Sequence, residues 1–183
     1  MADLQAPVLA AITAQIAAIE QELATLAKAD TPLGAQLRVV QSVPGLGLTT
    51  AATLVSGLPL HRLAGPRQVA AYVGLCPRER SSGSSVRGRS SIGSLGPAHL
   101  RRALYLPAVV AMRANPELRT FAERLRARGK PPKVVIVAVM RKLLLLAWAL
   151  LQSGQPYAPA HRPAAVVRQG DGHVHTVPRP LSA

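Results

Sequence analysis

The helical architecture of this chain is centred on the segment Val40-Gln41-Ser42-Val43-Pro44-Gly45-Leu46-Gly47-Leu48-Thr49-Thr50-Ala51-Ala52-Thr53-Leu54. Apolar residues recur at helical spacing on both sides of Pro-Gly-Leu-Gly, and glycine permits the tight turn between them. The pattern predicts a helix-hairpin-helix over residues 37–57, in which Gly45 and Gly47 let backbone N–H groups approach a DNA phosphate. An ordinary helical turn with a glycine cap is the alternative.

The rest of the chain has the same three- and four-residue periodicity, which predicts a mainly α fold. A seam of leucine and isoleucine predicts a coiled-coil-like helix over residues 1–30, which pairs either with another copy of the chain or with its own domain. The members of the seam are Leu9, Ile12, Ile16, Ile19, Leu23 and Leu26.

A helical domain over residues 31–154 is expected to follow the leading helix. Thr31 is the expected cap of its first helix, with Pro32 in the first turn. Further helices are predicted from Pro66 to Tyr72, from Pro97 to Asn115, from Glu117 to Arg128 and from Lys133 to Gln152. Residues 155–183 lack periodicity and are rich in Pro, His, Gly and Arg, which predicts a disordered tail. Two histidines there, His173 and His175, are too few to predict a metal site.

The chain is strongly basic because acidic residues are scarce. It has 22 Lys and Arg against 8 Asp and Glu, which gives a formal net charge of +14. Such a surface favours a polyanionic partner, DNA in preference to membrane headgroups. Two-metal nucleases need several convergent carboxylates, so the sequence predicts neither that activity nor any metal or other cofactor held by this chain. With aromatic residues at 3%, base stacking on single strands is not expected either.

The sequence also predicts a cytoplasmic protein. Its single cysteine, Cys76, cannot form an internal disulfide and is expected in the core. The first residues lack the regions of a signal peptide. The most apolar segment, Val134 to Leu151, contains Arg141 and Lys142 near its middle, which favours a buried helix over a membrane span.

A loop rich in serine, arginine and glycine runs from Arg78 to Ser91. Arginine side chains bind phosphate oxygens in pairs, and a serine hydroxyl among them could attack phosphorus to form a phosphoserine ester. The segment is predicted to be either a loop or a short exposed hairpin built on Val86 and Ile92. A flexible linker with solvated arginines is the alternative.

Five ordered blocks of residues resemble one protein family. They are Val43-Pro44-Gly45-Leu46-Gly47, Ala70-Ala71-Tyr72-Val73-Gly74-Leu75-Cys76-Pro77-Arg78, Ser82-Gly83-Ser84-Ser85-Val86-Arg87-Gly88-Arg89, Leu100-Arg101-Arg102-Ala103-Leu104-Tyr105 and Val137-Ala138-Val139-Met140-Arg141-Lys142-Leu143-Leu144. Together they resemble the C-terminal domain of the insertion-sequence transposases grouped as families 110, 116 and 902. The resemblance covers about residues 37–152, and the leading helix is similar to the coiled coil of that family.

The resemblance implies DNA transposition through a serine nucleophile. The Ser-Gly step of the family falls on Ser82, with Ser84 as the second choice. Arginines around it would stabilise the charge on the reacting phosphorus. The implied phosphate-binding set is Gly45, Gly47, Arg78, Arg80, Arg87, Arg89, Arg101 and Arg102.

The resemblance also implies partners. Family members carry an N-terminal RuvC-like domain whose acidic residues hold Mg²⁺; here the sequence begins at the coiled coil, so that domain is expected to be missing and a RuvC-like partner domain is expected to be needed. Some members use a guide RNA, and the leading helix implies a homo-oligomer. The usual Ile-Ser-Lys-x-Gly-Asn is Ile92-Gly93-Ser94-Leu95-Gly96-Pro97 in this chain. A non-catalytic DNA-binding module, an inactive remnant of such a transposase or an oligomerising scaffold are therefore the alternatives.

Overall fold

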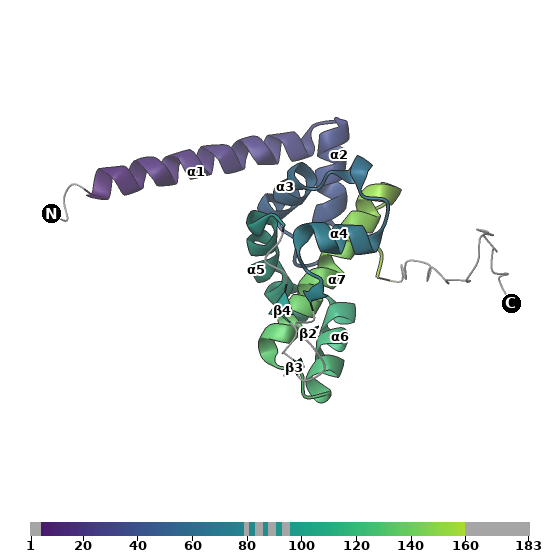
Figure 1. The fold of residues 1–183 in the computed structure, drawn as a ribbon. Helices are drawn as coiled ribbons and strands as arrows, with labels where there is room; N and C mark the ends of the chain where they lie inside the picture. Colours follow the sequence, from purple (N-terminus) through teal and green to yellow (C-terminus); the bar gives the residue numbers. More distant parts are fainter. Residues whose placement is uncertain (1–4, 79–80, 83–85, 88–90, 93–95, 160–183) are drawn as a thin grey trace, which may run out of the picture.

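In the computed structural model the described residues, 5–78, 81–82, 86–87, 91–92 and 96–159, are mainly helical (Figure 1). The α-helices are α1 (Gln5–Lys28), α2 (Pro32–Gln41), α3 (Leu48–Gly57), α4 (Pro66–Val73), α5 (Ala98–Ala114), α6 (Pro116–Ala127) and α7 (Pro132–Ser153). A short 3₁₀ turn, η2 (Leu60–Arg62), precedes α4, and four two-residue strands lie between α4 and α5. The predicted mainly α class is confirmed.

Local sequence signals account for where several helices begin and end. Thr31 caps α2, because its side-chain oxygen accepts a hydrogen bond from the Gly34 N–H at 3.1 Å. Asn115 caps α6 in the same way, accepting from the N–H groups of Glu117 and Leu118. Both caps are followed by proline at the first helical position, where the missing N–H costs no hydrogen bond.

The core is built around α7, which packs against α5, α6, α4 and α2. Its buried side chains are Val135, Val139, Met140, Leu143, Leu144, Ala147 and Leu150. By length and composition alone α7 would suffice to cross a membrane, but here it is the central helix of a bundle. The two cations near its middle lie at the bundle surface: Lys142 Nζ is 4.7 Å from the centre of the Phe121 ring, and Arg141 Nη1 is 3.6 Å from Cys76 Sγ.

Helix α1 projects away from this bundle (Figure 1). Only its C-terminal end contacts α2 and α3, where Ala27 is buried and Arg38 Nη1 donates to the Ala27 carbonyl at 2.7 Å. Toward the N-terminus the predicted seam is open: Leu9 is 62% and Ile16 is 52% exposed. Packing on its own domain therefore applies only to the end of the helix, and the coiled-coil pairing stays a prediction.

The segment after α7 returns across the bundle. Gly154 ends the helix in the left-handed region, at φ 66°. The Tyr157 N–H then donates to Ser42 Oγ at 2.7 Å, and Asn115 Nδ2 donates to the Tyr157 hydroxyl at 3.1 Å. Residues 155–159 are thus held against α2 and the α5–α6 junction, which corrects the predicted tail boundary at 155. The Tyr157 backbone N–H and the Tyr157 hydroxyl, each with one hydrogen-bond partner, fix this segment, and contacts of this kind leave no periodic signal. Residues 160–183, including His173 and His175, lie outside the described residues.

Candidate nucleic-acid interface

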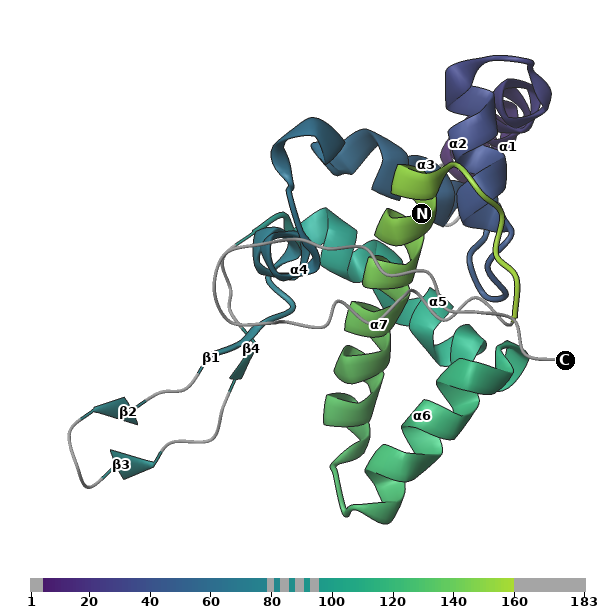
Figure 2. The same ribbon diagram turned by 90° about the vertical axis from the view of Figure 1, so that its right-hand side faces the viewer.

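The segment rich in serine and arginine carries two antiparallel strand pairs. Strand β1 (Pro77–Arg78) pairs with β4 (Ser91–Ile92), and β2 (Ser81–Ser82) pairs with β3 (Val86–Arg87). Figure 2 shows these strands projecting from the helical bundle beyond α4. Of the two conformations predicted for this segment, the structure has the hairpin, and Val86 and Ile92 both lie in its strands.

The strand register fixes the neighbours of the predicted nucleophile. The Cα partner of Ser82 is Val86, whereas the Cα partner of Ser81 is Arg87. In the other pair, Arg78 lies opposite Ser91. The structure therefore brings Ser82, Arg78 and Arg87 into one hairpin, with Arg78 in a different strand pair from the other two. Ser84, Arg80 and Arg89 lie outside the described residues.

Arg101 holds the base of this hairpin. Its Nη1 donates to the carbonyl of Val73, just before the hairpin, and to the carbonyl of Gly96, just after it, each at 3.0 Å. Gly96 has φ +105°, and a Cβ there would lie 2.2 Å from the Tyr72 carbonyl oxygen. The two ends of the hairpin therefore approach too closely for a side chain at Gly96, and the guanidinium joins them.

The two arginines predicted to bind phosphate on α5 thus differ in position. Arg101 donates hydrogen bonds to the carbonyls of Val73, 28 positions away in the sequence, and Gly96, 5 positions away. Sequence patterns do not reveal such contacts. Arg102 is exposed to solvent. For both arginines, phosphate binding stays a prediction.

The two glycines of the α2–α3 connection also differ. Gly45 has φ +103°, and a Cβ there would lie 2.8–2.9 Å from atoms of Ala111 on α5. Gly47 is the N-cap of α3 at φ −82°, with no side-chain cap on that helix, and a Cβ there would have no atom within 4 Å. Gly45 is therefore needed for packing, and Gly47 is the glycine with open space before the first N–H groups of α3.

These two regions lie on different sides of the bundle. In Figure 2 the strands β1–β4 extend to the left, while the blue α2–α3 connection lies on the right, close to the yellow-green segment that follows α7. The structure does not bring Gly45 and Gly47 together with Ser82. Within the described ranges, no three His, Cys, Asp or Glu side chains gather into a possible metal site.

Comparison with known proteins agrees with the resemblance that the five sequence blocks indicated. Residues 37–123 match the family model described as Transposase IS116/IS110/IS902 family. The chain is 31% identical to a pilin gene-inverting protein of Moraxella bovis over 144 residues, which are 78% of this chain and 45% of that protein. It is 34% identical over 162 residues to the insertion element IS110 uncharacterized 43.6 kDa protein of Streptomyces coelicolor, covering 86% of this chain and 38% of that protein. An IS900 42 kDa protein of Mycobacterium paratuberculosis is 32% identical over 129 residues, 69% of this chain and 32% of its own length. The chain thus spans less than half the length of these relatives.

Proposed function

Residues 37–123 belong to the IS116/IS110/IS902 transposase family, and from that membership we propose that this chain binds DNA and supplies a serine nucleophile for DNA rearrangement. The observation that supports the proposal most directly is the hairpin that projects from the bundle and carries Ser82 in its β2 strand. Transposition or inversion is the reaction class, since the Moraxella relatives are named for gene inversion.

The proposed step is a transesterification at phosphorus. The Ser82 hydroxyl oxygen forms a bond to a DNA phosphorus while its proton passes to water. One bridging P–O bond breaks, and the released deoxyribose oxygen takes up a proton, so that a phosphoserine ester holds one DNA end. Arg78 and Arg87, with Arg80 and Arg89, would stabilise the added negative charge, and guanidinium forks suit phosphate oxygens.

A covalent adduct is the direct test of this step. The chain is incubated with end-labelled duplex DNA, alone and with the RuvC-like portion of a relative, and is resolved by denaturing electrophoresis. We expect an adduct that disappears in Ser82→Ala and persists in the matched variants Ser81→Ala and Ser84→Ala. An adduct that persists in Ser82→Ala would move the nucleophile elsewhere, and loss only in Ser84→Ala would assign it to Ser84.

A non-catalytic DNA-binding module is the second candidate. It is favoured by the departure at Ile92–Pro97, where the lysine and asparagine of the family motif are replaced. It predicts duplex affinity that falls steeply with salt and is unchanged in Ser82→Ala. It also predicts that no adduct forms under either condition of the test above.

We also propose that two copies pair through α1. The open seam on this helix has apolar residues at heptad spacing, which is the arrangement that a second helix covers in a coiled coil. The metal chemistry of the family would come from a RuvC-like domain outside the residues described here. A guide RNA as a further partner, and action in the cytoplasm where the DNA lies, complete the proposal.

A further inference from the structure

Five exposed cations lie at the end of α6, on its connection to α7 and in the first turn of α7. Four of them, Arg124, Arg128, Lys130 and Lys133, we call the tip cluster; the fifth, Arg126, has its Nη2 4.0 Å from Met112 Sδ. The structure gives none of them an ion pair with a described carboxylate. The one acidic residue in the sequence from position 119 to position 152 is Glu123, beside Arg124. The cluster is therefore a local excess of positive charge without internal compensation.

Favourable interaction with a helix dipole explains the position of only two of the four cations. Arg124 and Arg128, one turn apart at the end of α6, are favourably placed beside the negative end of the α6 dipole. Lys130 and Lys133 flank the start of α7, where the helix dipole is positive and a cation is unfavourable. The first turn of α7 has no acidic residue and no side-chain cap. Cations and uncapped N–H groups together form a surface that attracts an anion.

The cluster is also held in a defined place. Gly129 has φ +69°, which allows the chain to reverse direction between the helices. The Gly129 N–H donates to the Arg126 carbonyl at 2.8 Å, and the Lys130 N–H donates to the Leu125 carbonyl at 3.1 Å. Pro131 and Pro132 follow and restrict the backbone further. Because the backbone that carries these side chains is ordered in advance, less backbone entropy is lost on binding than with a flexible segment.

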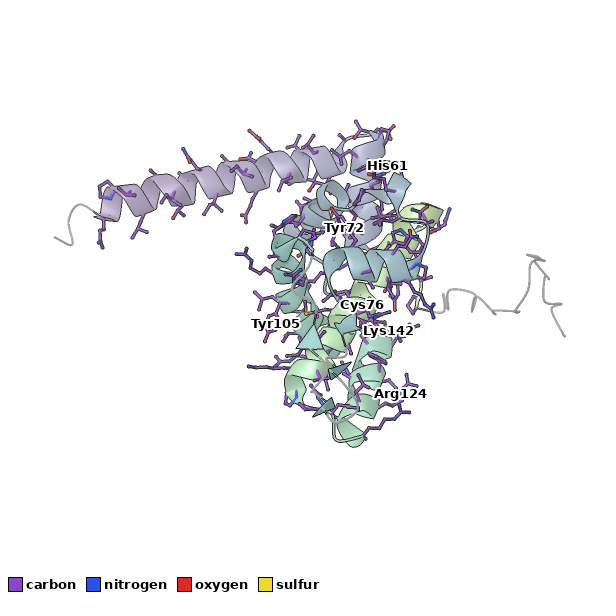
Figure 3. The ribbon with its side chains drawn as sticks, in the orientation of Figure 1. His61, Tyr72, Cys76, Tyr105, Arg124 and Lys142 are labelled. Atoms are coloured by element: carbon purple, nitrogen blue, oxygen red, sulfur yellow. The ribbon has the colours of Figure 1, made fainter. Side chains whose placement is uncertain are left out.

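The position of the cluster indicates the kind of partner. Figures 1 and 2, which share a vertical axis, both place the α6–α7 connection at the lower end of the molecule, toward which the β1–β4 hairpin also extends. In Figure 3 Arg124 lies near this end, and His61 lies near the opposite end. The nearby aromatic, Phe121, has Lys142 over its ring, so the cluster offers no aromatic platform for unpaired bases.

We propose that the tip cluster is a second contact surface for the phosphate backbone of duplex DNA, separate from the serine hairpin. It shares with the proposed function the premise that DNA is the partner, but it requires no nucleophile. Its contacts are electrostatic and independent of base sequence, so it would hold DNA on either side of a reacting site.

The test compares two triple variants with the same change in net charge. The first is Arg124→Gln, Arg128→Gln and Lys130→Gln. The matched control is Lys28→Gln, Arg62→Gln and Arg67→Gln, three exposed cations on α1, η2 and α4. Binding of the full chain to a 20-bp DNA duplex is measured by fluorescence anisotropy from 50 to 200 mM salt, and thermal unfolding by circular dichroism verifies that both variants fold.

We expect the tip variant to lower the slope of log Kd against log salt by about 0.9 for each phosphate that is no longer neutralised, or about 2.7 for three phosphates. Over that fourfold salt range the Kd of the wild type would then rise about 40-fold more than that of the variant. The control should change the slope by less than about 1. The double variant Arg124→Lys and Arg128→Lys should keep the wild-type slope, because the charge is retained.

Equal effects of the two triple variants would overturn the proposal, since net charge alone would then explain the affinity. A decrease confined to single-stranded DNA or to an RNA hairpin would overturn it as well. The serine chemistry is tested separately. If an adduct forms and the tip variant binds DNA as the wild type does, the nucleophile proposal is supported and the tip-cluster proposal is refuted. If the tip variant binds DNA weakly and no adduct forms under any condition, the tip-cluster proposal is supported and the nucleophile proposal is refuted.

Discussion

Replacing Gly45 and Gly47 separately by alanine tests how the α2–α3 connection works. At Gly45 the added methyl carbon would lie 2.8–2.9 Å from Ala111, with backbone atoms of α5 among its neighbours, and φ is +103°. Backbone strain in this region costs about 1–3 kcal/mol, and overpacking costs about 1–3 kcal/mol more. We therefore expect Gly45→Ala to lower the free energy of unfolding by about 2–6 kcal/mol.

At Gly47 the same methyl group enters open space at φ −82°. The remaining cost is that of a poorer N-cap, about 0.5–1 kcal/mol. Urea denaturation followed by circular dichroism measures both variants. With an m-value of about 2 kcal/mol/M, the midpoint of Gly45→Ala should fall by about 1 M or more and that of Gly47→Ala by less than about 0.5 M. Equal shifts would refute the packing of Gly45 against Ala111.

The same pair separates stability from DNA binding. If the N–H groups at the start of α3 bind a phosphate, a methyl group at Gly47 would hinder the approach of the backbone, and duplex affinity should fall although the fold is intact. Gly47→Ser is the matched control for the cap, because serine restores capping while still filling the space. Unchanged duplex affinity in both variants would contradict phosphate binding here and leave an ordinary glycine-capped turn.

Asn115→Ala should lower the free energy of unfolding by about 2–3 kcal/mol, because it removes the α6 cap and leaves the Tyr157 hydroxyl without this partner. Tyr157→Phe should lower it by about 1 kcal/mol, because only the hydroxyl contact is lost. Equal losses in urea titrations would contradict a separate contribution from the cap. Arg101→Lys keeps the charge, but the lysine ammonium reaches one atom less far than the Arg101 Nη1 that donates to both carbonyls at the hairpin base, so we expect a loss of about 1 kcal/mol in stability with near-normal duplex affinity. Reduced affinity with unchanged stability would instead make Arg101 a phosphate ligand. Ile16→Glu, on the open face of α1, should change the thermal midpoint little and abolish self-association measured by light scattering, whereas a wild-type chain that is monomeric at all concentrations would remove the coiled-coil proposal.

Local patterns predicted the helices well. Helices expected at 66–72 and 133–152 are observed at Pro66–Val73 and Pro132–Ser153. The same holds for the cap at Thr31 and for the proline-initiated start of α2. These features depend on residues within one or two turns of each other, so the sequence contains all that is needed to predict them. The family blocks were equally visible, because they are short ordered motifs.

The candidate site was predictable in composition but not in arrangement. Ser82, Arg78 and Arg87 lie in a hairpin, one of the two conformations expected for this segment, but the pairing of Ser82 with Val86 depends on a strand register that composition does not specify. The sequence pattern also made Arg101 equivalent to Arg102, and Gly45 equivalent to Gly47. What distinguishes the two members of each pair is a contact with an element that is distant in the sequence.

From the sequence alone came the helical class, the helix ends, the basic surface and the family, since all of these follow from composition or from neighbours along the chain. The packed fold decided which glycine is confined by α5, which arginine joins the ends of the hairpin, and that Tyr157 returns to Ser42 from 115 positions away. These assignments depend on contacts between elements far apart in the chain, and such contacts exist only after the apolar faces of those elements have been buried together.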